Sequence, residues 1–519
     1  MRATERLSAK APGLGWPFYF SEAVQICSRP RKLDSVCANM LRQEFRRPNC
    51  IGCGIRLHMP RSGLALIRKF TQISLLALVA FTANTMAAHA QTLAPTPPMG
   101  WNSWDAYGLT IDEADFKANA TVLAGIRQFG WQYAVIDEGW YMEDPFGGTP
   151  EKEKFHLDGN GRLIPALNRF PDAADGAGLK PLADWVHAQG LKFGIHLIRG
   201  IPRLSVHEKL PIAGSQFTAV DAADTSDVCP WNQDNYGIRD NAAGQAWYDS
   251  MIGLYASWGV DFLKVDCISD HPYKPTEIRQ ITEAIKKTGR PIVLSLSPGP
   301  TQLEHAAEVG KYAQMWRTSD DHWDVWSHVR KTGEGEFPMG TLQAFDRLAA
   351  WQPFVKPGNW PDDDMLPFGS LMPHPGWGDP RESRLTHDEE RTEFTLWAIS
   401  RSPLILGANL TNLDDFTRSL ITNKDVTEMN QTVVESRESP SHGPGIRIWT
   451  ATTGGDHPRA YVAVFNVGDT ATQFDLAWPA SSVKNPQHVY DVWNKTQLPA
   501  KSRVLVKLAP HACSLFRLD

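Results

Sequence analysis

The stretch DFLKVD at residues 261–266 predicts a short buried strand that ends in a carboxylate. Apolar residues at helical spacing come before it, namely Trp247, Met251, Leu254 and Trp258. A helix that leads directly into a short apolar strand is the repeating unit of a parallel α/β sheet. In barrel enzymes the functional residues lie at the carboxyl ends of such strands, which makes Asp266 a candidate by position.

The same alternation of helix and strand continues on both sides of this stretch. Seven further stretches predict strands: MGWNSW (99–104), WQYAVID (131–137), LKFGIHL (191–197), IVLSLS (292–297), MWRTS (315–319), NWPDDDM (359–365) and SPLILG (402–407). Eight strands with intervening helices predict an α/β fold, a (β/α)₈ TIM barrel over residues 95–430. A doubly wound parallel sheet is the alternative fold.

After about residue 435 the helical period disappears. Four stretches then alternate as half-buried strands do, namely GIRIWTA, RAYVAVFNV, HVYDVWN and SRVLVKLA. This pattern predicts a C-terminal antiparallel β-sandwich domain over residues 435–519. No low-complexity linker precedes it, so we expect it to pack against the barrel and support it.

The first 90 residues predict no part of the fold. Residues 1–58 are Arg-rich without a helical or strand period, and we interpret them as a disordered, non-native extension upstream of Met59. Residues 59–90 have the order of a signal peptide, with basic residues, the apolar stretch ISLLALVAF and small residues before Ala90. The apolar stretch is too short to span a membrane. We therefore expect a secreted or periplasmic protein without membrane contact after cleavage.

Composition narrows the class of partner. The formal net charge is −6 over 519 residues, and no block of five or six like charges predicts binding to nucleic acid or an anionic membrane. The 19 Trp residues favour a carbohydrate partner, because a flat indole covers the C–H face of a sugar. Cys229, Cys267 and Cys513 permit one disulfide and lack the His partners of a zinc site.

Acidic residues follow four of the predicted strands. They are Asp137 and Glu138, Asp266, Asp320 and Asp321, and the run Asp362, Asp363 and Asp364. A single aspartate at such a position can also cap the next helix. Four acidic clusters on one rim would be costly without a cation or a polyhydroxylated ligand. A metal site would also recruit histidine, and His196 alone closes a strand, so glycoside hydrolysis is favoured.

Lys264 lies two residues before Asp266, and the period of two places both side chains on one face of the strand. The lysine charge would keep Asp266 ionised, as a nucleophile requires. A purely structural buried ion pair is the alternative.

Five motifs, in order, resemble glycoside hydrolase family 27, the melibiase-like α-galactosidases. The motifs are MGWNSW (99–104), ID-x-x-W (136–140), GVDFLKVD (259–266), WR-x-x-x-D (316–321) and W-x-x-x-DML (360–366). The resemblance runs from about residue 97 through the C-terminal domain. It implies a retaining exo-glycosidase that removes terminal α-D-galactosyl residues by double displacement and needs no metal or organic cofactor.

The resemblance also implies roles for individual residues. Asp266 is expected to be the nucleophile and Asp321 the acid/base. The expected substrate-binding residues are Trp101 on the sugar face, Asp137 and Glu138 toward the hydroxyls at C4 and C6, Lys264 and Arg317 toward those at C2 and C3, and Asp364, His196 and Ser297.

Three departures from the family pattern bear on the substrate and on the loops. Glu138 stands where the family usually has a second Asp, and its extra methylene extends toward the C6 hydroxymethyl of galactose. L-arabinopyranose lacks that group, so β-L-arabinopyranosidase activity is the first alternative. Ser297 replaces a larger acidic residue near C2, which makes α-N-acetylgalactosaminidase a lesser one. Cys267 directly follows Asp266, and a disulfide to Cys229 is possible.

A protein that binds sugar without catalysis is the remaining alternative. The presence of both Asp266 and Asp321, together with Lys264 and Arg317, argues against it.

Overall fold

The computed structural model describes residues 92–519, apart from 148–149, 328–337, 373–378, 440–442 and 480–485. The predicted extension at 1–58 and the predicted signal peptide at 59–90 lie outside the described residues. Within the described residues, no helix combines the length and the apolar character needed to cross a bilayer.

A parallel sheet of eight strands forms the centre of the larger domain. Its strands are β1 (Met99–Asn102), β2 (Tyr133–Ile136), β3 (Lys192–Ile198), β7 (Phe262–Asp266), β8 (Val293–Leu296), β9 (Met315–Arg317), β10 (Trp360–Asp362) and β13 (Leu404–Leu406). Each lies within one of the stretches that the sequence predicts as strands, except that β3 continues one residue further, to Ile198. The buried, largely apolar character of these strands is typical of a parallel sheet covered on both faces.

The order of the strands shows that the sheet closes into a barrel. From β1 to β10 each barrel strand pairs with the next barrel strand along the chain, and the first strand, β1, pairs with the last, β13. At the remaining seam, Leu366 just after β10 forms a parallel bridge to Leu406 of β13. The predicted TIM barrel is therefore confirmed, and the doubly wound sheet is excluded, because such a sheet keeps two open edges.

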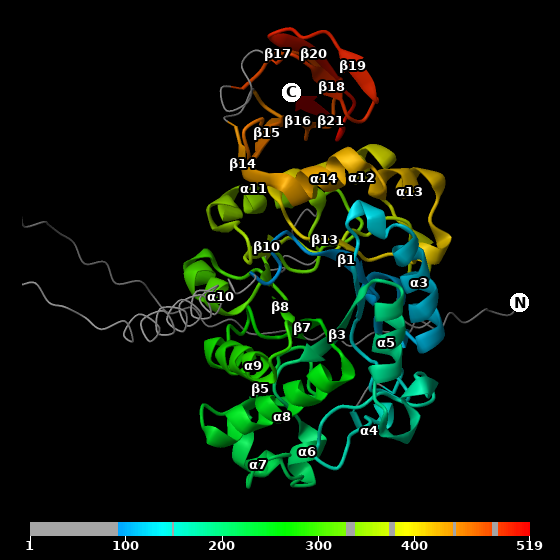
Figure 1. The fold of residues 1–519 in the computed structure, drawn as a ribbon, viewed down its shortest axis with the longest axis vertical. Helices are drawn as coiled ribbons and strands as arrows, with labels where there is room; N and C mark the ends of the chain where they lie inside the picture. Colours follow the sequence, from blue (N-terminus) through cyan, green and yellow to red (C-terminus); the bar gives the residue numbers. More distant parts are fainter. Residues whose placement is uncertain (1–91, 148–149, 328–337, 373–378, 440–442, 480–485) are drawn as a thin grey trace, which may run out of the picture. The chain divides into compact units, whose positions relative to one another are not determined.

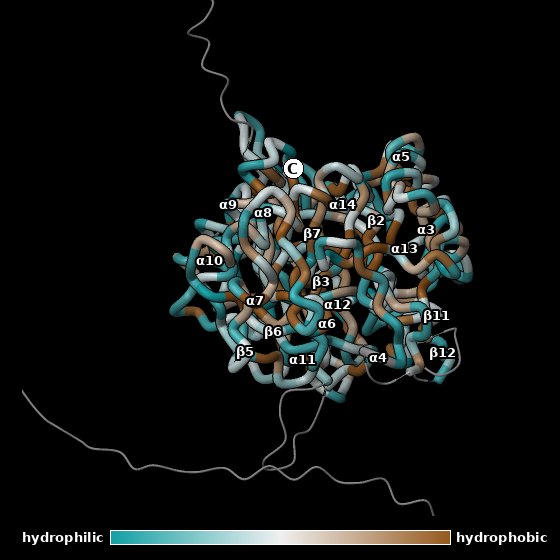
Figure 2. Tube along the Cα trace, turned by 90° about the horizontal axis from the view of Figure 1, so that it is seen from below, coloured by the Kyte–Doolittle hydropathy of each residue, from teal (hydrophilic) through white to brown (hydrophobic). Residues whose placement is uncertain are grey.

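Helices surround the barrel strands (Figure 1). The longer ones are α3 (Glu113–Gly125), α5 (Lys180–Ala188), α8 (Ala242–Trp258), α9 (Pro275–Thr288), α10 (Ala306–Tyr312), α11 (Thr341–Trp351), α12 (His387–Ser400), α13 (Asp415–Ile421) and α14 (Lys424–Thr432). Four are shorter: α2 (Trp104–Tyr107), α4 (Pro150–Glu153), α6 (Arg203–His207) and α7 (Ala219–Ala222). Figure 2 shows hydrophobic segments around β2, β3 and β7 and more hydrophilic residues in the outer loops and helices.

Helix α8 and strand β7 illustrate how the sequence sets the end of a barrel unit. The Asn241 side chain accepts a hydrogen bond from the Gly244 N–H at 2.8 Å and so caps the start of α8. The helix ends at Trp258, and Gly259 caps it with a φ of 95°, which suits a residue without a Cβ. The chain then enters β7, which places Asp266 at the carboxyl end of the strand.

The long connection after β3 has structure that the sequence did not predict. Strands β4 (Ile201–Pro202), β5 (Ala223–Val228) and β6 (Asn235–Ile238) form a small three-stranded sheet there. A disulfide joins Cys229, which follows β5, to Cys267, which follows β7. The disulfide thus ties this connection to the residue beside Asp266. A second short pair, β11 (Ser370–Leu371) and β12 (Arg381–Glu382), lies after β10.

The C-terminal strands form an antiparallel β-sandwich, as predicted. One sheet has six strands in the order β14 (Val433–Glu438), β15 (Ile446–Thr453), β16 (Ala460–Asn466), β21 (Cys513–Leu518), β18 (Val489–Asp491) and β19 (Thr496–Leu498). The other sheet pairs β17 (Thr472–Ala477) with β20 (Arg503–Leu508). Side chains from both sheets share one apolar core, including Val462, Phe516, Leu476 and Val506.

Polar contacts join this domain to helix α12 of the barrel. The Thr392 hydroxyl donates to the backbone oxygen of His511 at 2.6 Å. The Trp493 indole donates to the Thr395 hydroxyl at 3.1 Å. The two domains therefore pack against each other, in agreement with the absence of a linker in the sequence.

Candidate active site

A cavity of about 420 Å³ opens at the carboxyl ends of the barrel strands. This volume lies within the range of roughly 300–1,000 Å³ that is typical of small-molecule sites. Its lining includes six of the residues expected from the sequence, namely Asp137, Glu138, Lys264, Asp266, Arg317 and Asp321. Strands β2, β7 and β9 deliver these side chains from three separate parts of the chain.

Asp266 is the acid at the end of β7. Its Oδ1 accepts a hydrogen bond from the Cys267 N–H at 2.7 Å, and its Oδ2 lies 3.4 Å from His196 Nε2. Burial alone would raise the pKa of this carboxyl. The contact with His196, the charge of Lys264 and the Cys267 N–H together hold the pKa below its ordinary value. Asp266 is therefore an ionised carboxylate facing the cavity.

Lys264 forms a direct ion pair with Asp137 at the base of the cavity. Its Nζ lies 2.8 Å from Asp137 Oδ2, which also accepts a hydrogen bond from Asn102 Nδ2 at 2.7 Å. Burial opposes the lysine charge, but Asp137 and Asp266 raise the pKa of Lys264 above its ordinary value. Lys264 therefore acts on Asp266 through its charge, while its direct carboxylate contact is with Asp137.

Asp321 lies opposite this group and near Arg317. The Arg317 Nη2 lies 3.3 Å from Asp321 Oδ1 and 2.7 Å from Asp364 Oδ2. The Asp321 side chain is 43 % exposed within the cavity. The cavity walls, together with the charges of Asp364 and Asp266, outweigh Arg317 and raise the pKa of Asp321 to about 6. A carboxyl with this pKa can hold and release a proton near neutral pH.

Glu138 lines the cavity beside Asp137. Its Oε1 accepts a hydrogen bond from Asn232 Nδ2 at 2.9 Å, a contact between residues that are 94 positions apart. Burial, reinforced by Asp234 and Asp266, raises the pKa of Glu138 to about 8, although His196 opposes the shift. Glu138 is thus largely protonated at neutral pH and can donate a hydrogen bond to a ligand.

Trp101 does not line the cavity, and the prediction that it stacks on a sugar is wrong. Its side chain is fully buried, donates its indole N–H to the Ala408 oxygen at 2.8 Å, and packs against Phe116 with ring centroids 5.8 Å apart. Trp104, three residues later, lines the cavity instead. Trp101 belongs to strand β1 and faces the helical layer, whereas Trp104 lies just past the end of that strand.

Three other expected binding residues lie beneath the cavity surface, and the structure does not place them where they would touch a ligand. His196 is fully buried against Asp266 and Asp137. Ser297 is 1 % exposed and lines a small internal cavity together with Asp364. Asp364 accepts from Arg317 and from the His322 N–H at 2.8 Å. His196 is placed to orient Asp266 and Asp137, and Asp364 is placed to orient Arg317.

Several cavity residues were not identified from the sequence. Besides Trp104, the connection after β5 contributes Trp231, Asn232, Gln233 and Asp234. This connection carries no helical or strand period, so only its neighbouring cysteine, Cys229, hinted at a role.

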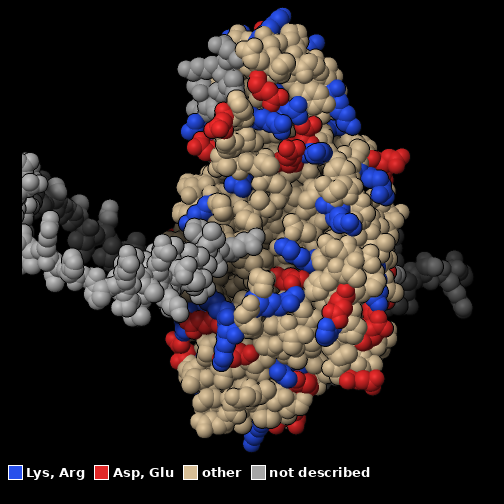
Figure 3. Space-filling model, in the orientation of Figure 1, with Lys and Arg blue, Asp and Glu red and all other residues tan. Residues whose placement is uncertain are grey.

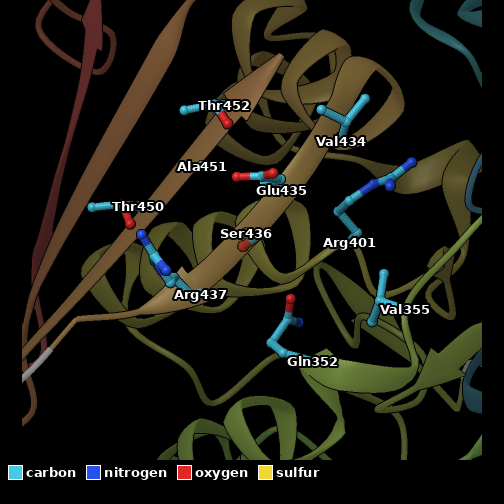
Figure 4. A pocket seen from close by; sticks show the side chains of 10 residues that line it. All are labelled: Gln352, Val355, Arg401, Val434, Glu435, Ser436, Arg437, Thr450, Ala451 and Thr452. Carbon is cyan, nitrogen blue, oxygen red and sulfur yellow. The ribbon is translucent and has the colours of Figure 1, made fainter. Parts of the chain in front are cut away.

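A second pocket, of about 360 Å³, lies between the barrel and the C-terminal sheet (Figure 4). Glu435 and Arg437 come from β14, while Gln352 and Arg401 come from the barrel. Among the described residues that line this pocket Glu435 is the only carboxylate, so they include no acid pair like that of the larger cavity.

Charges of both signs are interspersed on the face shown in Figure 3. Within the described ranges, no group of three or more His, Cys, Asp or Glu side chains is arranged to hold a metal ion.

Comparison with known proteins identifies the family of the chain. The profile of the family described as alpha galactosidase A matches residues 241–432. The profile described as alpha galactosidase C-terminal beta sandwich domain matches residues 443–518. The curated alpha-galactosidase A of Cellvibrio japonicus is 28 % identical over 466 residues, which cover 86 % of this chain and 98 % of that protein.

Solved structures are similar over the same region. The GH27 β-L-arabinopyranosidase of Geobacillus stearothermophilus is 40 % identical, with a TM-score of 0.76, over 83 % of this chain and 98 % of that chain. A variant of that enzyme in complex with arabinose matches equally well, at 40 % identity and a TM-score of 0.76. The matches extend over both domains, and the proteins concerned are glycosidases. The chain therefore belongs to glycoside hydrolase family 27 and is a glycoside hydrolase that acts on a carbohydrate substrate.

Proposed function

We propose that the protein is a retaining exo-glycosidase that hydrolyses terminal β-L-arabinopyranosyl residues, with Asp266 as nucleophile and Asp321 as acid/base. The observation that carries the mechanism is the pairing of two carboxyls with opposite pKa shifts in one cavity. The pKa of Asp266 is lowered, while that of Asp321 is raised to about 6. Acids whose environments move their pKa values apart are suited to opposite roles.

In the first step the Asp266 carboxylate attacks the anomeric carbon and forms a glycosyl ester as the glycosidic C–O bond breaks. Asp321 gives its proton to the departing oxygen. In the second step Asp321, now ionised, takes a proton from water while the water oxygen attacks the same carbon. The ester bond breaks, Asp266 is again a carboxylate, and the sugar leaves with the anomeric configuration of the substrate.

Two features support arabinopyranose as the sugar. Glu138 has one methylene more than the usual Asp, and Asn232 holds its carboxyl in the cavity at 2.9 Å. A side chain in that position reduces the space for a C6 hydroxymethyl, which L-arabinopyranose lacks. The Geobacillus stearothermophilus relative at 40 % identity is a β-L-arabinopyranosidase.

The α-D-galactosidase reading remains the second candidate, because curated α-galactosidases match most of the chain at 24–29 % identity. The two sugars share their ring stereochemistry, so one cavity can accept both at different rates. The placement of Ser297, 1 % exposed and below the cavity, gives no support to an N-acetylgalactosaminide substrate.

Glu138→Asp is expected to shift the ratio of kcat/KM for β-L-arabinopyranoside over α-D-galactopyranoside toward the galactoside by about tenfold or more. One methylene of discrimination typically accounts for about 10–200-fold. The measurement is the initial rate on the two aryl glycosides, with the aryl α-N-acetylgalactosaminide as a third substrate.

Glu138→Gln is the matched control, because an amide has the size of the protonated glutamic acid and should keep the wild-type preference below pH 8. A wild-type enzyme that prefers the galactoside, with Glu138→Asp leaving the ratio unchanged, would contradict arabinopyranose as the sugar.

The protonation of Asp321 should determine how kcat/KM changes with pH. On substrates with a poor leaving group, kcat/KM should fall as the pH rises through about 6, because Asp321 then loses the proton that it must donate. Asp266 has a lowered pKa, so the acidic limb should lie below the ordinary range of an Asp. A profile that stays flat from pH 5 to pH 8 would contradict the assignment of Asp321 as the acid.

Export from the cytoplasm is also part of the proposal. The Cys229–Cys267 disulfide supports it, because disulfides persist mainly in oxidising compartments. Fractionation of producing cells, with sequencing of the mature N-terminus, is the test, and cleavage after Ala90 is the expected result.

A further inference from the structure

Trp231 differs from the other tryptophans of the described part of the chain. Its side chain is 46 % exposed, whereas each of the others is buried or only partly exposed. It also lines the cavity that holds Asp266 and Asp321. An indole is a large apolar ring that is usually buried, so a half-exposed one at the edge of a cavity is typical of a surface that a ligand covers.

The segment that carries Trp231 is fixed on both sides. Cys229, two residues before it, is joined by the disulfide to Cys267. Asn232, the next residue, donates to Glu138 Oε1 at 2.9 Å. In addition, Gln233 Nε2 donates to the Cys229 oxygen at 3.1 Å. The indole is thus held in place before a ligand arrives, which lowers the entropic cost of binding.

The Trp231 ring contacts a side chain that faces the residue next to Asp321. The ring packs against that of His271, with centroids 5.1 Å apart and planes inclined by 60°. The His271 Nε2 lies 3.7 Å from Oδ1 of Asp320, and Asp320 directly precedes Asp321. In the proposed mechanism Asp321 protonates the departing oxygen, so the leaving group must lie on this side.

We propose that Trp231, supported by His271, forms the binding surface for the sugar ring of the leaving group. The indole would stack on the C–H face of the first sugar beyond the scissile bond. This proposal rests on the proposed function, because it uses Asp321 to define the leaving-group side. It assigns a second subsite to the cavity, specific for a carbohydrate ring and not for the terminal sugar.

The test compares two substrates that carry the same terminal sugar. One is a disaccharide, whose leaving group is a sugar ring, and the other is the glycosyl fluoride, whose leaving group has no ring. Trp231→Ala is expected to lower kcat/KM on the disaccharide by about tenfold and to change the value on the fluoride by less than about twofold. Trp231→Tyr, which keeps an aromatic face, should recover most of the loss.

Two controls distinguish general damage to the structure from loss of the contact with the leaving group. Phe146→Ala removes another exposed aromatic, one that is 58 % exposed and absent from the lining of the cavity, and should leave both rates unchanged. Inhibition by the free terminal monosaccharide should be the same in wild type and Trp231→Ala.

The proposal is overturned if Trp231→Ala lowers kcat/KM equally on the disaccharide and the fluoride, or changes kcat/KM on neither substrate. Failure of the proposed function has a different signature, since the wild-type enzyme would then hydrolyse neither substrate, or Asp266→Asn would hydrolyse both.

Discussion

Asp266→Asn is expected to lower kcat/KM on aryl glycosides by at least about 10⁴-fold, since loss of a nucleophile removes the covalent step. The amide has nearly the size of the carboxylate, so the cavity should keep its shape. Lys264, Glu138 and Arg317 remain in place, and the terminal monosaccharide should bind within a few-fold of its wild-type affinity. The measurements are initial rates and calorimetric titration with the monosaccharide.

The matched control is Asp240→Asn, a change of the same kind at a carboxylate that is 67 % exposed and paired with Arg279. It should keep full activity, because it leaves the cavity lining unchanged. Substantial turnover by Asp266→Asn would contradict the assignment. A loss of activity accompanied by loss of monosaccharide binding would point instead to a damaged cavity.

Asp321→Ala is expected to have the second largest effect, and that effect should depend on the leaving group. On a sugar leaving group the loss should be about 10²–10⁴-fold, the range of general acid catalysis. On a dinitrophenyl glycoside the first step needs little protonation and should stay fast, so the glycosyl-enzyme accumulates. Added azide should then restore turnover, because it attacks the anomeric carbon without a general base.

A variant of the neighbouring residue, Asp320, provides the control for Asp321→Ala. Asp320 faces His271, 3.7 Å from its Nε2, and Asp320 does not belong to the lining of the cavity. Asp320→Asn should therefore cost much less activity on both leaving groups and should not respond to azide. If the azide-dependent behaviour appears in Asp320→Asn and not in Asp321→Ala, the acid/base has been assigned one residue too late.

The barrel could be predicted because its signals are local. Each strand is a short apolar stretch that follows a helix, and β7 is predicted by DFLKVD within two residues of its observed ends. The acids Asp266 and Asp321 stand at strand ends, where the fold itself brings them to one rim. The candidate catalytic pair was therefore accessible from the sequence once the barrel was inferred.

Side-chain direction at the end of a strand was harder to predict. The motif MGWNSW offers two tryptophans, and the choice between them depends on where β1 ends. The strand runs to Asn102, so Trp101 packs on the helical layer and Trp104 reaches the cavity. Boundaries of elements are set by tertiary hydrogen bonds, here including the bond from the Ser103 N–H to the Val135 oxygen.

Contacts over long sequence separations were only partly predictable: the sequence made a Cys229–Cys267 disulfide possible, but it did not indicate the contact between Asn232 and Glu138. Asn232 meets Glu138 across 94 positions, and Cys229 meets Cys267 only because the three-stranded sheet after β3 returns the chain to the end of β7. This segment lacks a helical or strand period, so nothing in the sequence indicated that Trp231 lies at the cavity. Asn232 and Trp231, which we connect with the binding of the substrate, lie in this part of the chain, whereas Glu138 was identified from its motif.

Covalent trapping of the enzyme tests the central claim most directly. A fluorinated glycosyl fluoride of the preferred sugar should form an intermediate that is hydrolysed slowly, and mass spectrometry of a protease digest should locate it. The peptide that contains Asp266 is expected to gain the mass of one fluorosugar, and the Asp266→Asn variant is expected to gain none. A label on any other residue would contradict Asp266 as the nucleophile. Rapid release of product with inverted configuration and no labelled peptide would contradict the retaining mechanism.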